Sequence, residues 1–182
     1  MLSKGWDAVV ICGTDPHSSE YPASRWKQVE WLTGFTGEAG DVVITASEAG
    51  LWTDSRYFIQ ALAQLDGTGV ELHKTRVPGA VGIPEWLSDK ARTVAVDGLC
   101  WEVSAVKEIE EALGDGGLVV DAPDMLEGLW EDRPLVPVTP VTTLDVECFG
   151  GKLRDEKISW LRKWMLLQGV DRVLLTSLDE IA

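Results

Sequence analysis

The stretch Trp31-Leu-Thr-Gly-Phe-Thr-Gly-Glu-Ala-Gly40, followed by Leu51-Trp-Thr-Asp-Ser-Arg-Tyr-Phe-Ile-Gln-Ala61, decides the fold class of this chain. Two β-prone runs, Val42–Thr45 and Leu51–Thr53, flank the small and polar residues 46–50. This pattern predicts two strands joined as a hairpin. The hairpin leads directly into a helical pattern, so the stretch predicts a strand followed at once by a helix.

That junction carries the first candidate site residues. Asp54 or Ser55 can cap a helix whose apolar residues recur at positions 58, 61, 62 and 65. The pattern thus places Arg56 in the first helical turn, beside Tyr57. Ligands of α/β domains often bind at such strand ends.

The rest of the first 130 residues alternates between strand and helix patterns. Strands are predicted at residues 8–12, 70–74, 93–96 and 118–121, and helices at 23–32, 84–91 and 103–113. Alternation of this kind is typical of an α/β domain.

A proline-rich connector at 133–140 follows, and we place a domain boundary near Gly150. Residues 1–150 then form one α/β domain. Residues 151–182 begin a second, with a helix at 152–168 and a strand at 170–176. Because one helix and one strand do not make a compact domain, we expect a fragment of a longer polypeptide.

Composition excludes several classes of partner. The net charge of −14, from 16 basic and 30 acidic side chains, repels phosphate backbones and anionic lipids, so we expect no nucleic acid or membrane partner. Three cysteines without a Cys-x-x-Cys motif favour neither a zinc site nor a disulfide framework and fit a reducing cytoplasm. With no leader-like N-terminus and no window of about 18 apolar residues, we expect a soluble, cytoplasmic protein.

Two other motifs have simple structural interpretations. Gly34, Gly37 and Gly40 follow a predicted helix and precede a strand, the reverse of a phosphate-binding loop, which favours a turn. His17 lies with Asp15 and Glu20 in one short loop. These residue types suit a metal site, and His17, Ser18 and Glu20 have the types of a hydrolase triad, but a local hydrogen-bonded loop is the simpler interpretation.

The residues leave the role of Arg56 open. An arginine at a strand end can bind a carboxylate or a carbonyl with its fork of donors. It can equally form an ion pair with Asp54 or Glu30 that holds the corner. His73, on a predicted strand, reads as a surface or half-buried residue. Four tryptophans, Trp26, Trp52, Trp160 and Trp164, fall at core-like positions, and Trp101 and Trp130 are candidates for an interface.

Four ordered motifs resemble the N-terminal portion of three-domain Xaa-Pro aminopeptidases of the M24 peptidase family. They are Asp15-Pro-His-Ser-Ser-Glu-Tyr21, Gly34-Phe-Thr-Gly-Glu-Ala-Gly40, Leu51-Trp-Thr-Asp-Ser-Arg-Tyr-Phe58 and Thr176-Ser-Leu-Asp-Glu-Ile-Ala182. Val96-Asp97 and Trp130-Glu-Asp-Arg-Pro134 match further segments of that family. The motifs are spread along the sequence, so the resemblance extends over nearly the whole chain.

The resemblance implies a creatinase/prolidase N-terminal-like domain with a mixed sheet flanked by helices, followed by the start of a second, similar domain. The catalytic pita-bread domain would lie beyond Ala182. Family members cleave the bond between an N-terminal residue and a following proline with a hydroxide held by two metal ions, usually manganese. The metal ligands belong to that absent domain, so no catalytic or metal-binding residue is assigned here.

The same resemblance implies that Arg56 binds the peptide substrate, with His17 and Tyr57 as supporting residues. Ser55 stands where the family motif has glycine. The parent protein is expected to be a cytoplasmic homodimer acting on short proline-containing peptides, with this fragment inactive alone as a gating and assembly region. The alternatives are a noncatalytic protein-binding module with a creatinase-like fold and a prolidase or creatinase type of hydrolase.

Overall fold

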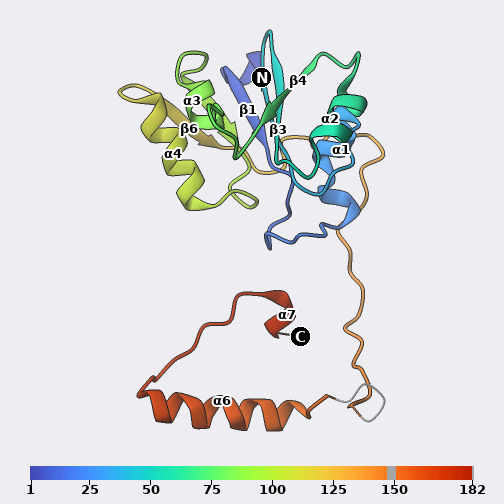
Figure 1. Cartoon of the computed structure of the whole chain (residues 1–182), viewed down its shortest axis with the longest axis vertical. Helices are drawn as coiled ribbons and strands as arrows, with labels where there is room; N and C mark the ends of the chain where they lie inside the picture. The colour runs from blue at the N-terminus through green and yellow to red at the C-terminus, as the bar shows by residue number, and fades with distance from the viewer. Residues whose placement is uncertain (147–150, 182) are drawn as a thin grey trace. The chain divides into compact units, whose positions relative to one another are not determined.

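The computed structural model describes residues 1–146 and 151–181. Its centre is a six-stranded sheet in the order β4-β3-β2-β1-β5-β6 (Figure 1). The strands are β1 Ala8–Ile11, β2 Asp41–Thr45, β3 Ala49–Thr53, β4 Val70–Lys74, β5 Thr93–Val96 and β6 Leu118–Asp121. Every strand lies within two residues of its predicted position.

The sheet is mixed, as expected. Strand β2 runs antiparallel to both β1 and β3, so the predicted hairpin of β2 and β3 is confirmed. The pairs β1 with β5, β3 with β4 and β5 with β6 are parallel. Five strands therefore end at one edge of the sheet, where β2 begins.

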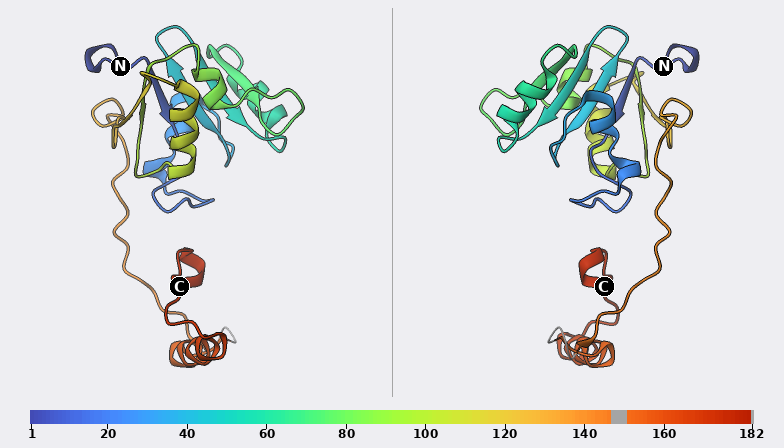
Figure 2. Two further views of the ribbon diagram at one scale, coloured as in Figure 1. Left: turned by 90° about the vertical axis from the view of Figure 1, so that its left-hand side faces the viewer. Right: turned by 90° about the vertical axis from the view of Figure 1, so that its right-hand side faces the viewer.

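Helices cover both faces of this sheet. They are α1 Gln28–Thr33, α2 Phe58–Leu65, α3 Ile83–Leu87 and α4 Val103–Leu113, with short 3-10 helices at Leu2–Lys4 and Ser24–Trp26. Figure 1 shows α1 and α2 on one side of the sheet and α3 and α4 on the other. The opposed views in Figure 2 place α4 in front of the sheet from one side and α1 from the other. The fold is a three-layer α/β domain.

Alternation along the strands divides the core between these two faces. Val43 and Trp52 face α3 and α4, in a cluster with Leu87 and Ile109. Their neighbours in the strands, among them Leu51, face α1 and α2, in a cluster that contains Phe35 and Leu65. Because successive strand residues point to opposite faces, both layers are packed by the same strands.

Three helices differ from the prediction. The helix expected at 23–32 is split into the 3-10 turn Ser24–Trp26 and α1, which ends at Gly34 with φ of 74°. Helix α2 begins only at Phe58, so Arg56 lies in the preceding turn and the prediction that it sits in the first helical turn is wrong. Helix α3 ends at Leu87 rather than residue 91, since the Ser88 hydroxyl bonds the Glu85 carbonyl.

The chain divides into two compact units, Met1–Val136 and Pro137–Ala182, within the proline-rich connector. The second unit contains α6 Arg154–Gln168 and α7 Leu178–Ile181. Cys148 and the boundary expected near Gly150 fall outside the described residues. In the described part of the chain, Cys12 and Cys100 are free and buried.

Two expectations for the second unit are wrong. The strand predicted at 170–176 forms no ladder among the described residues, since no strand of this unit is there to pair with it. Trp160 and Trp164 are 63% and 40% exposed rather than core residues. The helix presents apolar side chains, but the described residues of its unit form no sheet against which to bury them. Trp52, by contrast, is 3% exposed, as predicted.

Candidate functional site

The predicted site residues all follow strand ends at the carboxyl edge of the sheet. The loop after β1 carries His17, and the turn after β3 carries Arg56 and Tyr57. Because β1 and β3 are parallel to each other through the intervening β2, their ends meet at the same edge. Open α/β sheets bind ligands at this edge.

Arg56 forms the local ion pair that the sequence allowed. Its Nε and Nη2 atoms donate to the two carboxylate oxygens of Asp54 at 3.0 and 2.8 Å, and its backbone N–H donates to the same carboxylate at 3.1 Å. The Arg56 side chain stays 59% exposed, while that of Asp54 is 12% exposed. The carboxylate therefore orients the guanidinium at the surface and leaves it accessible.

This ion pair shifts both protonation equilibria. The hydrogen bonds from Arg56 lower the pKa of the Asp54 carboxyl, and the carboxylate in turn raises the pKa of the guanidinium.

Ser55 is not among the described non-glycine residues with positive φ. The turn therefore accommodates serine at the glycine position of the family motif without backbone strain.

Tyr57 links the turn to the glycine-containing loop. Its ring packs edge-on against Phe35 with centroids 5.9 Å apart, and its hydroxyl donates to Glu38 at 3.3 Å. The guanidinium of Arg56 lies 5.1 Å from the Tyr57 ring centroid. Gly37 is required here because a Cβ would come within 2.2 Å of the Phe35 ring. Tyr57, which packs on the fully buried Phe35, thus supports the guanidinium of Arg56.

His17 lies in a loop that is organised by Asp15. The buried Asp15 carboxylate accepts the backbone N–H groups of His17 and Ser19 at 2.9 and 3.0 Å. His17 itself is exposed. The local hydrogen-bonded loop predicted for this segment is confirmed.

The structure places His17, Arg56 and Tyr57 at one edge of the sheet, but not all of them are in contact. Glu20, in the His17 loop, acts electrostatically on Arg56. Among the described residues no hydrogen bond or ion pair links His17 to Arg56 or Tyr57. In the same part of the chain, no group of three or more His, Cys, Asp or Glu side chains is placed to hold a metal ion. No metal chemistry is therefore derived from these residues.

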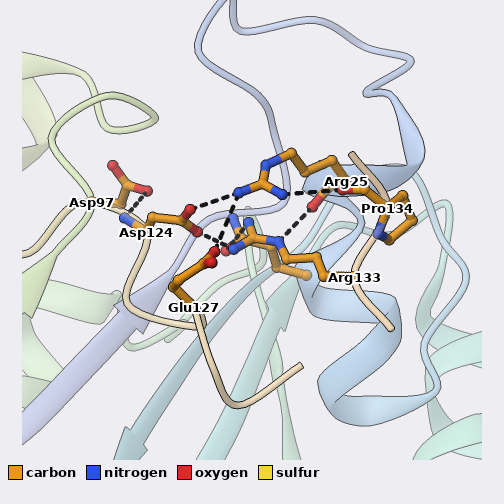
Figure 3. Close-up of polar contacts among 7 residues, drawn as sticks. Arg25, Asp97, Asp124, Glu127, Arg133 and Pro134 are labelled. Atoms are coloured by element: carbon orange, nitrogen blue, oxygen red, sulfur yellow. Dashed lines mark hydrogen bonds and ion pairs between the residues drawn. The ribbon is translucent and has the colours of Figure 1, made fainter. Parts of the chain in front are cut away.

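A network of charged residues that the sequence reasoning did not assign lies near the same edge (Figure 3). Arg25 and Arg133 both pair with the Asp124 carboxylate, Arg25 at 2.7 Å. Arg25 also donates to the carbonyl of Pro134 at 3.1 Å, and Arg133 to that of Arg25 at 3.2 Å. The Arg133 side chain is only 6% exposed. The Asp132-Arg133-Pro134 motif is the part of the sequence that could have indicated this network. The contacts of Arg25 and Arg133 hold the first residues of the connector against the domain.

A cavity of about 350 Å³ opens at the same edge, on the side covered by α3 and α4. Its apolar lining includes Trp52, Ile83 and Trp101, and Asp41 and Asp54 are among its polar residues. Asp54 thus belongs both to the ion-paired turn and to the lining of an open cavity of ligand size.

The fold and these loops match a known domain family. The sequence profile of the creatinase/prolidase N-terminal domain matches residues 1–129. The chain belongs to this family. The N-terminal domain of the cytoplasmic peptidase PepQ from Mycobacterium tuberculosis shares the fold, with a TM-score of 0.53 and 24% identity, over 70% of this chain and 90% of that one.

Two relatives extend the likeness over both units. Aminopeptidase P1 of Arabidopsis thaliana is 32% identical, and the match covers 97% of this chain and 27% of the relative. The crystal structure of an X-prolyl aminopeptidase from Caenorhabditis elegans, described as a cytosolic enzyme with a di-nuclear active site, has a TM-score of 0.80 and 34% identity. The structural match covers 96% of this chain and 29% of the C. elegans enzyme. The chain thus spans less than a third of these aminopeptidases and corresponds to their N-terminal region.

The described helices include none that is both long and apolar enough to cross a lipid bilayer.

Proposed function

We propose that this creatinase-family chain is the N-terminal region of a metal-dependent Xaa-Pro aminopeptidase. In the parent protein it limits access to the active site and takes part in assembly. The reaction releases the first residue of peptides that have proline in second position. Catalytic residues and metal ligands lie in the parent's catalytic domain, so this region is inactive alone.

The observation that carries the proposal is the extent of the match. The PepQ domain aligns with only 70% of the chain, whereas the C. elegans aminopeptidase aligns with 96% of it. The additional segment includes residues of the second unit, with its helix α6. A layout with a single creatinase-type domain before the catalytic domain gives no reason for that segment to match.

Arg56 is proposed to bind the peptide, with His17 and Tyr57 shaping the surface around it. Arg56 suits this role because Asp54 and the Tyr57 ring hold its guanidinium in place while most of it stays exposed. An oriented guanidinium can donate to a peptide carbonyl or carboxylate with little loss of side-chain freedom on binding.

The parent protein is further proposed to be a cytoplasmic homodimer that uses two manganese ions. The di-nuclear active site of the C. elegans enzyme supports two metal ions. Bound metal ions supply a hydroxide nucleophile near neutral pH by lowering the pKa of water.

The first experiment is hydrolysis of the tripeptide Arg-Pro-Pro by the parent protein, with and without manganese. Manganese-dependent release of the first residue is the expected result. Absence of cleavage by folded, metal-loaded protein would contradict the aminopeptidase proposal and favour a noncatalytic binding module.

The role of Arg56 is tested in the same protein with Arg56→Ala. Loss of one charged contact to substrate is expected to lower kcat/KM by about tenfold or more without changing the fold. The matched control is Arg92→Ala, since Arg92 is also exposed but precedes β5 at the opposite edge of the sheet. Equal kinetics for the two variants would remove Arg56 from the site.

A further inference from the structure

The cavity beside α4 contains a carboxylate without a cationic partner. Asp41 begins β2, lines the cavity and accepts a hydrogen bond from the Gly13 N–H at 3.1 Å. None of the ion pairs formed by described residues includes Asp41. Burial raises its pKa, and the Gly13 hydrogen bond opposes that shift only in part. A half-buried carboxylate in this condition is stabilised by any cation that reaches it.

The other charges of the cavity do not supply that cation. Arg76 also lines the cavity, but it acts on Asp54, which Arg56 already pairs. Glu108, on α4, adds a further exposed acidic side chain to the lining. The cavity therefore contains more carboxylates than cations, and Asp41 forms no ion pair with a described residue.

The walls of the cavity suit an apolar stem. Trp52 and Trp101 contribute aromatic rings, and Ile83 and Ile109 contribute branched aliphatic surface. Both tryptophans therefore offer apolar surface to a ligand stem.

We propose that this cavity is a binding site for a guanidinium group on a short apolar stem. The guanidinium pairs with Asp41, and the stem packs against Trp52, Trp101 and the two isoleucines. A volume of about 350 Å³ accommodates a group of the size of one amino-acid residue. The site lies wholly within the first unit and does not depend on the proposed peptidase activity.

The test is an NMR titration of the 182-residue chain with L-argininamide, which carries a guanidinium on an apolar stem. Binding is expected to shift the Trp101 indole signal and the amide signals of Ala105 and Ile109, with saturation at millimolar concentration or below. L-norvalinamide, which lacks the guanidinium, is expected to bind at least about tenfold more weakly. Equal affinity for the two amides would overturn the proposal.

Two variants locate the binding. Asp41→Asn keeps an acceptor for the Gly13 N–H and is expected to weaken binding by at least about tenfold. Ala105→Phe, which fills the cavity from α4, is expected to abolish it. Glu111→Gln is the matched control, because Glu111 is exposed on α4 outside the cavity lining and its change removes the same charge.

Two outcomes contradict the site. Signal changes spread over the acidic surface, and equal effects of Asp41→Asn and Glu111→Gln, would mean nonspecific attraction of a cation to a chain of net charge −14. Unchanged binding by a folded Ala105→Phe variant would place the ligand elsewhere.

Discussion

At the scale of single residues, Asp54 takes part in two features of the site. Its carboxylate accepts two hydrogen bonds from the Arg56 guanidinium, and the residue also lines the cavity. Because the guanidinium and the carboxylate are two residues apart, their pairing needs no tertiary contact. The cavity, in contrast, needs Trp101 and α4 from a distant part of the chain.

The first residue-scale prediction concerns the Asp54 carboxyl. Since hydrogen bonds from Arg56 are the largest cause of its lowered pKa, Arg56→Ala is expected to raise that pKa toward the ordinary value of 3.8. Carboxyl ¹³C chemical shifts followed over a pH titration measure it. Arg56→Lys is the comparison, and it should recover only part of the shift because lysine lacks the two-pronged donor geometry. An unchanged pKa in Arg56→Ala would show that the pair does not persist in solution.

The second concerns His73, which stacks on Trp52 with ring centroids 4.0 Å apart and has a buried Nε2 without a hydrogen-bond partner among the described residues. Burial lowers its pKa, with Lys90 acting in the same direction and Glu71 and Glu48 opposing. The unfolded chain therefore takes up the proton first as pH falls below about 6.5. The free energy of unfolding is expected to fall from that pH down to the folded pKa, and then to level.

Denaturant unfolding at several pH values checks this dependence. His73→Gln should remove the part of it that lies near pH 6. His17→Gln is the matched control, since the chain contains only these two histidines and His17 is exposed. A pH dependence that is the same in both variants would assign it to the carboxylates instead.

At the scale of elements, the loop between α1 and β2 is fixed by one aromatic ring. Phe35 is fully buried against the cluster of α1 and α2 and supports Tyr57. Gly37 and Gly40 approach its ring closely enough that a Cβ at either position would crowd it. The glycine motif is therefore a packing motif around Phe35, in agreement with its interpretation as a turn.

Phe35→Ala is accordingly expected to destabilise the domain by about 3–5 kcal/mol, because it removes a buried ring and leaves a cavity. Equilibrium denaturation measures the loss. The control is Ile59→Ala on α2, where the side chain is 86% exposed and the change should stay within about 0.5 kcal/mol. Similar losses for the two variants would contradict the assignment of Phe35 to the core.

At the scale of the whole molecule, the charged network of Arg25, Asp124 and Arg133 joins distant segments near the end of the first unit. Arg25 and Asp124 are 99 positions apart in sequence, and Arg133 reaches the backbone of Arg25 across 108 positions. Asp124 takes a positive φ of 53° and donates its N–H to Asp97 at 3.0 Å. The network therefore joins the end of β5, the segment after β6 and the start of the connector.

Arg133→Met is expected to destabilise the first unit by about 2–4 kcal/mol, since it leaves the Asp124 carboxylate with one cation fewer in a partly buried site. It should also increase proteolytic cleavage within the connector at 134–140. Urea unfolding and timed proteolysis measure the two effects. The control Arg154→Met changes an exposed arginine of α6, and an equal loss of stability there would contradict the role given to Arg133.

The sequence by itself determined the class of the fold, the six strands, the hairpin, the Asp15 loop and the two readings of Arg56. These features depend on local periodicity, turn residues and contacts between near neighbours. Only the tertiary structure decided the network of Arg25, Asp124 and Arg133 and the cavity with Asp41, because both join segments that the sheet order brings together. The tertiary structure also decided that residues 151–181 are largely exposed and form no strand. Their helical pattern is local, but burial of Trp160 and a ladder at 170–176 require neighbouring elements that their unit does not provide.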